Sequence, residues 1–382
     1  MKIAIVGAGI GGLTAAIALG QRSHDVTVYE QAPALGEIGA GITITPNADR
    51  VFTALGLGQA LAPYQVIPQR QLTQHWQTGA VLKDVERGTA TAQRYGAGYY
   101  HIHRADLHSV LADTFLKACP SGIKLGQPAH LASADGRLPL ASGETVAADL
   151  VIGADGLKSQ VRETAFETDR PEFTGQVAWR GLVPTASAAG LPNMDTPGVH
   201  IGPKQLFLRY PVRGGDLTNY AAFVDVGDWA DEGWTIPSSR AELLGYFGDW
   251  DAGVVALIEA TPDTELFKWA LNVRRPLSTW VAGKVTLIGD AAHAMLPFMG
   301  QGAATAIEDA MVLARSLEGS DLAESLSRYD AARRQRTDAI QENSRLLGLQ
   351  FQGKDPADQS GHRIKNEEEL GLFDYDATSV AI

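Results

Sequence analysis

Three glycines and one acid near the start of this 382-residue chain have residue types and spacing suited to dinucleotide binding. Gly7, Gly9 and Gly12 follow a G-x-G-x-x-G pattern, and Glu30 closes the next apolar run. In such a pattern the first glycine permits a tight turn and the second lets the backbone approach a pyrophosphate. The third lets a helix pack closely on a strand, and the acid can bind a ribose. The four residues predict a dinucleotide site without separating FAD from NAD.

The elements around these glycines would position them for that chemistry. Residues 2–6 predict a buried parallel strand, residues 13–21 a helix and residues 25–30 a second strand. The helix would turn its free N–H groups and positive end toward the phosphates. A glycine-rich turn without a ligand is the alternative, and the strand–turn–helix–strand order disfavours it. Beyond the second strand, residues 36–41 predict a glycine-rich loop and residues 65–103 a strand-like region.

A second strand end carries an acid. Residues 149–154 form a short apolar run that ends at Asp155-Gly156. Open α/β sheets bind ligands at the carboxyl ends of parallel strands, which favours a ligand role for Asp155. As a bare motif, Asp155 could instead cap the helix that begins near Ser159.

A third strand end is followed by a long helix. Residues 283–289 predict a strand that ends at Asp290, and residues 303–317 predict a helix. The positive end of that helix would point toward whatever Asp290 faces. The tail is expected to be helical from about 320 to Gly348, and Glu367-Glu368-Glu369 to be a solvated acidic face.

The middle of the chain has a different character. Residues 173–268 hold four of the seven tryptophans, and the runs 205–210 and 220–226 alternate as antiparallel strands do. Pro211 is expected to break the first of these strands, and Gly214-Gly215-Asp216 marks a hairpin turn between them. Such a sheet inserted into a Rossmann-type chain predicts a separate substrate domain.

Composition bounds the function. The formal net charge of −12 argues against nucleic acid or an anionic membrane as a partner. Cys119 is the only cysteine, so the chain can form neither an internal disulfide nor a cysteine metal cluster, and a reducing cytoplasmic location is expected. His101 and His103 share a strand face, but no third ligand is evident and no metal is predicted.

Together, the motifs at 7–12, 149–156 and 289–302 resemble the single-component FAD-dependent aromatic hydroxylases. The branch of salicylate, 3-hydroxybenzoate and 6-hydroxynicotinate monooxygenases is the most similar, from Tyr95-Gly96 and the runs 103–108 and 210–215. The resemblance implies an α/β fold. It comprises a Rossmann-type FAD-binding domain, an inserted, mainly antiparallel β-sheet substrate domain and a C-terminal helical segment.

The resemblance also implies domain limits and site residues. The FAD-binding domain would take residues 1–72, 96–172 and 272–345, the substrate domain residues 73–95 and 173–271, and the C-terminal tail residues 346–382. The residues expected to bind FAD are Gly7, Gly9, Gly12, Glu30, Arg104, Asp155, Gly156, Asp290, Gly300, Gln301, Gly302 and Ala303. Pro297 would belong to a loop beside the isoalloxazine ring, and Tyr210 would line the substrate pocket. A sheet aromatic packed in the core is the alternative for Tyr210, while His293 is expected to be a structural hydrogen-bonding residue.

The implied reaction is a hydroxylation. NADH or NADPH would reduce FAD, O₂ would add at flavin C4a, and the hydroperoxide would hydroxylate a phenolic, aromatic-acid or N-heteroaromatic substrate. Nicotinate-type relatives place histidines where this chain has Thr43 and Phe298, which weakens the case for 6-hydroxynicotinate itself. Two alternatives are a flavoprotein reductase or oxidase without oxygen insertion and a non-enzymatic FAD-binding sensor. A monomer or homodimer is expected.

Overall fold

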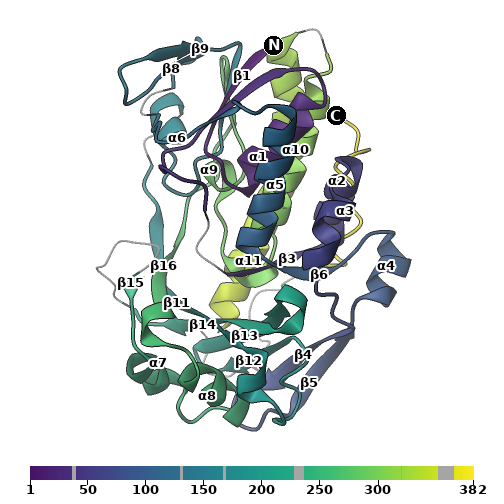
Figure 1. Cartoon of the computed structure of the whole chain (residues 1–382), viewed down its shortest axis with the longest axis vertical. Helices are drawn as coiled ribbons and strands as arrows, with labels where there is room; N and C mark the ends of the chain where they lie inside the picture. Colours follow the sequence, from purple (N-terminus) through teal and green to yellow (C-terminus); the bar gives the residue numbers. More distant parts are fainter. Residues whose placement is uncertain (37–39, 130–131, 167–168, 228–235, 320, 352–364) are drawn as a thin grey trace.

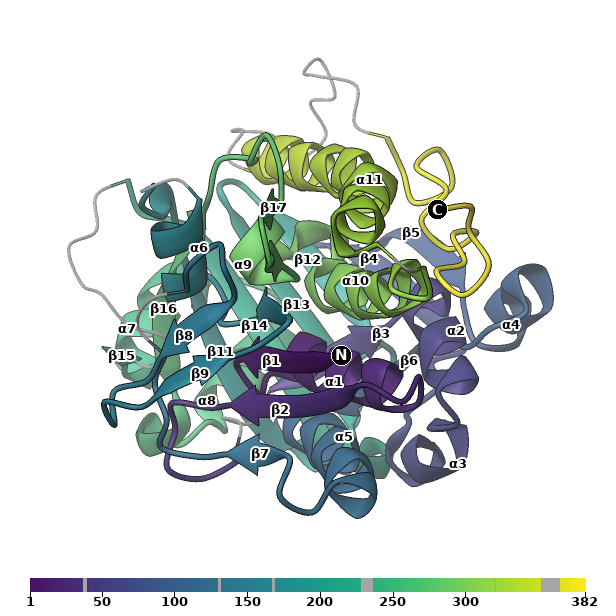
Figure 2. The same cartoon turned by 90° about the horizontal axis from the view of Figure 1, so that it is seen from above.

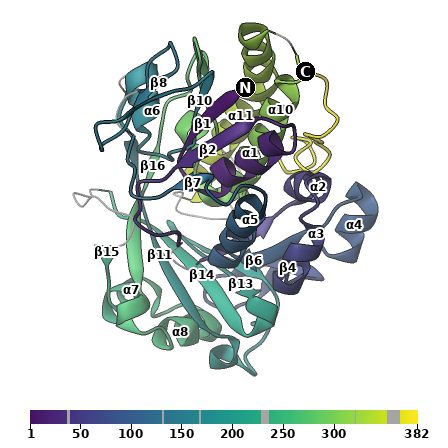
Figure 3. The same ribbon diagram turned by 45° about the horizontal axis from the view of Figure 1, so that its top comes forward.

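The computed structural model describes residues 1–36, 40–129, 132–166, 169–227, 236–319, 321–351 and 365–382. Figures 1 and 3 show two layers, with a parallel sheet and its long helices above a broad antiparallel sheet. None of the helices in these ranges is long and apolar enough to cross a membrane.

The parallel layer is built on a six-stranded sheet. Its order is β17 (Val281–Ala282), β18 (Val285–Leu287), β10 (Leu150–Gly153), β1 (Lys2–Val6), β2 (Asp25–Tyr29) and β7 (Ile123–Lys124). β1 pairs in parallel with both β10 and β2, and β10 pairs in parallel with β18. The carboxyl ends of β1, β10 and β18, which carry the three motifs, therefore lie side by side at one edge.

Helices cover this sheet, and the last of them ends at Phe351. They are α1 (Ile10–Gly20), α2 (Pro46–Ala54), α3 (Gly58–Leu61), α5 (Arg104–Ala118), α6 (Gln160–Ala165), α9 (Asp290–His293), α10 (Gly302–Ser316) and α11 (Leu322–Phe351). α1 packs between α5 and α10, and α10 also contacts α11 and α2. Figure 2 shows these helices beside the strands of the parallel layer. The shared core explains why residues in α1 are small or aliphatic.

The second layer is an eight-stranded sheet. Its order is β15 (Ile236–Pro237), β16 (Phe267–Val273), β11 (Glu172–Pro184), β14 (Leu217–Asp225), β13 (Gln205–Val212), β12 (Gly198–Gly202), β4 (Arg70–His75) and β5 (Val81–Glu86). All neighbours pair antiparallel except β12 and β4. One face packs on α7 (Arg240–Phe247) and α8 (Ala252–Glu259), which Figure 1 shows below the sheet. The other face packs toward the parallel layer.

Two small sheets complete the fold. β3 (Gly41–Ile44) pairs with β6 (Tyr100–His103), and β8 (Arg137–Pro139) pairs with β9 (Thr145–Ala147). The β3–β6 ribbon also contacts β13, so it joins the two layers. The architecture confirms the expected fold class. The proposed domain limits stay a prediction, while the strands of the eight-stranded sheet come from residues 70–86 and 172–273.

Four local expectations were wrong. α4 (Thr89–Tyr95) interrupts a region expected to be strand-like. α11 continues past Gly348, because that glycine packs against Phe298, where a Cβ would lie 2.8 Å from the ring. β13 does not break at Pro211, which stays paired with Thr218 of β14. Pairing of β13 with β12 ends at Arg209, so β12 needs no backbone N–H from residue 211.

The fourth error concerns the acidic tail. Glu367 is not simply solvated, because its carboxylate receives two hydrogen bonds from Arg87, at 2.6 and 3.0 Å. Glu368 pairs with Arg94 at 2.5 Å. Part of the expected glycine-rich loop at 36–41 lies outside the described residues. Two of the four tryptophans of the middle region, Trp229 and Trp234, lie wholly outside them.

Candidate active site

The first glycine motif forms a compressed turn between β1 and α1. Gly7 has φ +104°, and a Cβ there would lie 2.4 Å from the carbonyl oxygen of Ala154. A Cβ on Gly12 would lie 2.1 Å from the carbonyl oxygen of Gly7. Only glycine allows this close approach of the turn, the helix and the end of β10.

Gly9 differs from its neighbours because its missing side chain would point into open space. Its φ of −72° suits any residue, and no atom of the described residues lies within 4 Å of a Cβ built there. This open space lies at the N-terminus of α1, where the first backbone N–H groups have no partner within the helix. A pyrophosphate fits such a space, because the N–H groups and the helix dipole attract an anion.

Glu30 and His108 hold the same turn in place. One Glu30 carboxylate oxygen accepts from the backbone N–H of Ala8 at 2.8 Å, and the other accepts from Ala32 at 2.9 Å. His108, on α5, contacts the carbonyl oxygen of Ala8 through Nε2 at 2.7 Å. Sequence reasoning missed His108, whose partner is a backbone atom 100 residues away. The ribose contact expected of Glu30 stays a prediction.

Asp155 caps α6 in this structure. Its carboxylate accepts hydrogen bonds from Ser159 Oγ at 2.6 Å and from the N–H groups of Gln160 and Val161 at 2.7 and 3.1 Å. Burial raises the pKa of Asp155, although these hydrogen bonds favour the charged form. The geometry favours the capping alternative for Asp155, and a contact of Asp155 or Gly156 with FAD stays a prediction.

Asp290 occupies the start of α9, directly after Gly289 at φ +60°. Its side chain is accessible to water, yet desolvation by surrounding protein raises its pKa, opposed by charges on His293 and Arg104. The fold thus brings Arg104, at the start of α5, into electrostatic range of Asp290.

A buried ion cluster fixes the turn that presents Asp290. Asp309, on α10, accepts from the Gly289 N–H at 2.9 Å and contacts His293 Nε2 at 2.6 Å and Arg333 Nε at 2.8 Å. Burial alone would raise the pKa of Asp309, but His293 and Arg333 hold it at about 2. His293 is therefore hydrogen-bonded within the protein, as expected. Sequence reasoning missed Asp309 and Arg333, since acids and arginines on helices are usually solvated.

The loop before α10 combines a fixed glutamine with open glycines. Gln301 is buried, and its Oε1 accepts from Asn47 Nδ2 at 3.1 Å. Gly300 has φ +63°, and a Cβ on Gly300 or Gly302 would meet no described atom within 4 Å. Pro297 and Gly300 are exposed. The N-terminus of the 15-residue α10 thus lies beside open space, where its dipole can stabilise negative charge.

Tyr210 lies where β13 meets the β3–β6 ribbon. Its ring stacks on His101, with centroids 4.3 Å apart and planes at 20°, and a Cβ on Gly41 would lie 2.3 Å from its Cε2. Asn219, opposite Tyr210 on β14, accepts from the Gly41 N–H at 2.7 Å. Sequence reasoning missed His101 as the stacking partner, because the pairing joins two layers.

The Tyr210 hydroxyl keeps access to solvent although the residue is 7 % exposed. Among the described residues, no group forms a hydrogen bond with this hydroxyl, and its oxygen is not fully buried. Burial raises the pKa of Tyr210 well above its usual value, so the phenol stays protonated at neutral pH. It can therefore donate a hydrogen bond to a ligand from this junction.

Comparisons with known proteins agree with this geometry. A family model described as an FAD binding domain matches residues 1–344. The chain is 38% identical over 359 residues to the 3-amino-4-hydroxybenzoate 2-monooxygenase PtnB3 of Streptomyces platensis, covering 92% of this chain and 88% of that protein. It is 36% identical to the 6-hydroxynicotinate 3-monooxygenase of Pseudomonas fluorescens, covering 89% of each. The crystal structure of Klebsiella pneumoniae HpxO complexed with FAD and uric acid matches with a TM-score of 0.83 and 28% identity, covering 93% of this chain and 90% of that one.

The chain belongs to the FAD-binding family of flavin-dependent aromatic hydroxylases. It is an enzyme, an oxidoreductase of the monooxygenase type, and FAD is its cofactor. These findings confirm the expected family, and they contradict the non-enzymatic alternative. NAD(P)H is the standard co-substrate of such hydroxylases. The residue assignments toward FAD and substrate stay predictions.

Proposed function

We propose that this enzyme consumes NADH or NADPH and O₂ to hydroxylate a phenolic, aromatic-acid or N-heteroaromatic ring. When bound, FAD supplies the redox chemistry by the route that the sequence resemblance implies. The observation that carries the proposal is the protonated, solvent-accessible hydroxyl of Tyr210 at the junction of the two layers. Tyr210 lies between the parallel layer and the eight-stranded sheet. A residue placed there could orient a substrate ring between FAD and that sheet.

The chain's own residues would divide the work. The open space at Gly9 would receive the pyrophosphate, and Asp290 with Arg104 would hold the ribityl chain. The N-terminus of α10, at Gly302, would stabilise negative charge on the flavin ring, with Pro297 beside it. These assignments are supported by the open space at Gly9 and Gly302 and by the electrostatic interaction between Asp290 and Arg104.

Tyr210 would orient the substrate by donating a hydrogen bond to a ring hydroxyl or carboxylate. Small misplacements of a reacting ring are expensive, so the position of this phenol controls whether oxygen reaches carbon or is lost as hydrogen peroxide. An aromatic substrate is supported by the relatives, one of which is named for 3-amino-4-hydroxybenzoate and another for 6-hydroxynicotinate.

The test is a panel of hydroxylated and carboxylated aromatic and pyridine compounds. NADH and NADPH oxidation, hydrogen peroxide release and product mass are measured for each. A product with one new ring hydroxyl supports the proposal, whether it is heavier by one oxygen atom or has lost its carboxyl group as CO₂ at the hydroxylated carbon. Coenzyme oxidation that never yields such a product would support a reductase or oxidase instead.

The Tyr210→Phe variant tests the role of the phenol. We expect it to keep FAD and stability, to bind substrate more weakly, and to release more hydrogen peroxide per NADH consumed. Flavin content at the wild-type level is the control. Unchanged coupling and substrate affinity would show that Tyr210 is a packing residue. A cytoplasmic location and a monomer or homodimer are further parts of this proposal.

A further inference from the structure

The C-terminal segment, residues 365–382, packs against the enzyme through specific contacts. Arg50 on α2 donates to the carbonyl oxygens of Phe373 and Tyr375, at 2.5 and 3.1 Å. The guanidinium carbon of Arg336 lies over the Tyr375 ring, 3.9 Å from the ring centroid. Arg336 also donates to the carbonyl oxygen of Leu372 at 3.1 Å. Figures 1 and 2 show this segment in yellow beside α2.

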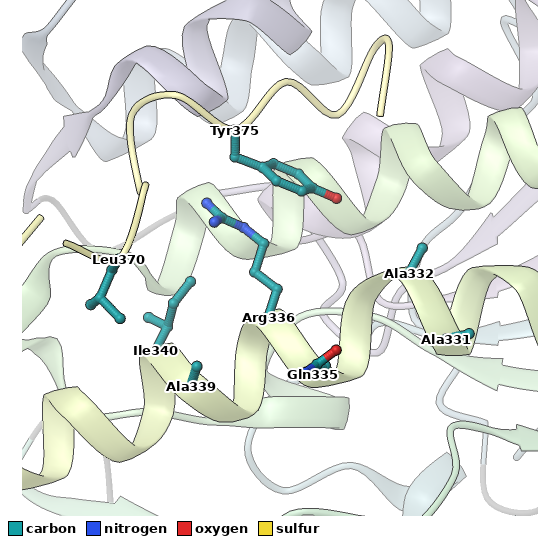
Figure 4. A pocket seen from close by; sticks show the side chains of 8 residues that line it. All are labelled: Ala331, Ala332, Gln335, Arg336, Ala339, Ile340, Leu370 and Tyr375. Carbon is teal, nitrogen blue, oxygen red and sulfur yellow. The ribbon is translucent and has the colours of Figure 1, made fainter. Parts of the chain in front are cut away.

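Figure 4 shows how this packing leaves a cavity between the segment and α11. The cavity has a volume of about 300 Å³ and is lined by Ala331, Ala332, Gln335, Arg336, Ala339, Ile340, Leu370 and Tyr375. Arg336 crosses it to reach Tyr375, and its guanidinium is also bound to the buried Glu308 at 2.9 Å. The segment is therefore anchored to the buried ion cluster of α10 and α11.

Phe373 begins a column of aromatic rings. Its ring lies 6.1 Å from that of Tyr99, and Tyr99 meets His101 edge to face at 5.7 Å and 82°. His101 then stacks on Tyr210 at 4.3 Å. Phe373, Tyr99, His101 and Tyr210 form what we call the aromatic column, which runs from the C-terminal segment to the candidate substrate tyrosine.

A charged pair holds the same column from its side. Arg87 is bound to Glu367 by two hydrogen bonds, and its guanidinium lies 4.8 Å from the Tyr99 ring centroid. Arg87 Nε donates to Gln71 Oε1 at 3.0 Å, and the Tyr99 hydroxyl donates to the same oxygen at 3.4 Å. The Arg87 side chain is 10% accessible and the Glu367 side chain 35%, so this pair is partly shielded from water.

His101 is the ring that connects Tyr99 to Tyr210. Its Nδ1 lies 3.0 Å from Thr43 Oγ1, and its buried Nε2 has no partner among the described residues. The His101 ring is packed between the edge-to-face contact with Tyr99 and the stack on Tyr210. A shift of Tyr99 would therefore move the face on which Tyr210 rests.

We propose that the C-terminal segment is a positioning element for substrate hydroxylation, and that Phe373 and Glu367 set the orientation of Tyr210 through the aromatic column. The proposal rests on the proposed role of Tyr210. It assigns an indirect influence on coupling to a segment outside the three candidate cofactor-binding motifs. Glu367 and Phe373 are positioning residues, since neither touches the reacting atoms.

Adjacent residues provide a matched control. Glu368 also pairs with an arginine, Arg94, but both side chains of this pair are more than half exposed, so the pair contributes little. The guanidinium of Arg94 lies over Tyr95, whose ring contact with the column is to Phe373 and not to Tyr99. We therefore compare Phe373→Ala and Glu367→Ala with Glu368→Ala in the full-length holoenzyme. The first two variants are expected to raise KM for the aromatic substrate by roughly tenfold and to increase hydrogen peroxide per NADH, with unchanged flavin content. Glu368→Ala is expected to match the wild type.

Two further measurements separate positioning from general loosening. In a Tyr210→Phe background, Phe373→Ala should cause no additional loss of coupling, because the end of the column has already lost its hydroxyl. Additive losses would overturn the proposal, and so would wild-type coupling in both Phe373→Ala and Glu367→Ala.

The second measurement does not depend on activity. Nitration of Tyr210 by tetranitromethane, followed by peptide mass spectrometry, should be faster in Phe373→Ala and Glu367→Ala than in the wild type and Glu368→Ala. Unchanged nitration rates would overturn the inference. Faster nitration in a protein that hydroxylates no aromatic compound would support the aromatic column while contradicting the proposed function.

Discussion

Gly9→Val separates cofactor binding from folding, because the protein surrounds Gly9 less than the other glycines of its motif. The backbone at Gly9 has φ −72° and ψ −179°, which valine adopts without strain. Its side chain would enter space in which no described atom lies within 4 Å. The matched variant is Gly12→Ala, whose Cβ would lie 2.1 Å from the Gly7 carbonyl oxygen.

The two substitutions should therefore differ in their effect on stability: Gly9→Val should leave the fold nearly intact, whereas Gly12→Ala should destabilise it. A non-polar residue in place of glycine at a helix N-cap costs up to about 1 kcal/mol, and the loss of unfolded-state freedom offsets about 0.4–1 kcal/mol. The fold of Gly9→Val should thus be nearly as stable as the wild type. Overpacking at Gly12→Ala should lower the free energy of unfolding by about 1–3 kcal/mol or more.

The expected loss of FAD affinity in Gly9→Val is large. A branched side chain would keep the pyrophosphate from the N–H groups of α1, and each hydrogen bond to a charged group contributes about 1.5–3 kcal/mol. Loss of two such bonds amounts to about 3–6 kcal/mol, which corresponds to a rise in the FAD dissociation constant of roughly 10²- to 10⁴-fold.

The assay is a fluorescence titration of apoprotein with FAD, beside urea unfolding of the same apoprotein. We expect Gly9→Val to unfold near the wild-type midpoint and to bind FAD weakly or not at all. Wild-type FAD affinity in Gly9→Val would refute the placement of the pyrophosphate. A large fall in apoprotein stability would refute the claim that the space is open.

Three further predictions concern the binding of FAD and the roles of Asp290 and Asp155. The purified enzyme should be yellow, and acid precipitation should release all of its FAD, since no covalent link is proposed; flavin that stays with the precipitate would contradict this. Asp290→Ala should weaken FAD binding by roughly 10- to 100-fold through loss of one charged hydrogen bond. Asp155→Ala should mainly lower the free energy of unfolding, by about 0.5–2 kcal/mol, through loss of the α6 cap. Equal FAD affinities in these two variants would contradict the assignment of Asp290.

Local patterns predicted much of the fold. The parallel strands of the first motif and the hairpin of β13 and β14 follow from periods of apolar residues and from turn glycines, which depend on neighbours in sequence. The end of α11 was wrong because Gly348 allows close packing against Phe298, and local propensity does not register tertiary contacts.

The candidate site was less predictable than the fold. The strand ends that carry Gly9 and Asp290 could be located, because motif spacing reports a turn. The partners that fix them could not, since His108 and Arg333 act on atoms about 100 and 24 residues away. The acidic tail was misjudged for the same reason: the 280 residues between Arg87 and Glu367 hide their pairing from any sequence window.

His101 gives a pH prediction whose sign can be worked out. Burial, and secondarily the charge of Arg87, lowers the pKa of His101 from 6.5 to about 3. Between these pH values the unfolded chain binds a proton that the folded chain does not, so stability falls as the pH falls. Its contribution is fully present above pH 6.5 and is lost progressively toward pH 3, at up to about 1.4 kcal/mol per pH unit.

The His101→Asn variant isolates this effect, since asparagine does not titrate. Urea unfolding of the apoprotein at pH 7, 6 and 5, values spanning the upper part of that window, gives the slope of unfolding free energy against pH. We expect the variant to be less stable at pH 7, because it loses the stack on Tyr210, but to have a shallower slope below pH 6.5. An equal slope in both proteins would mean that His101 is protonated in the folded state, and Tyr210 would then rest on a cation rather than on a neutral ring.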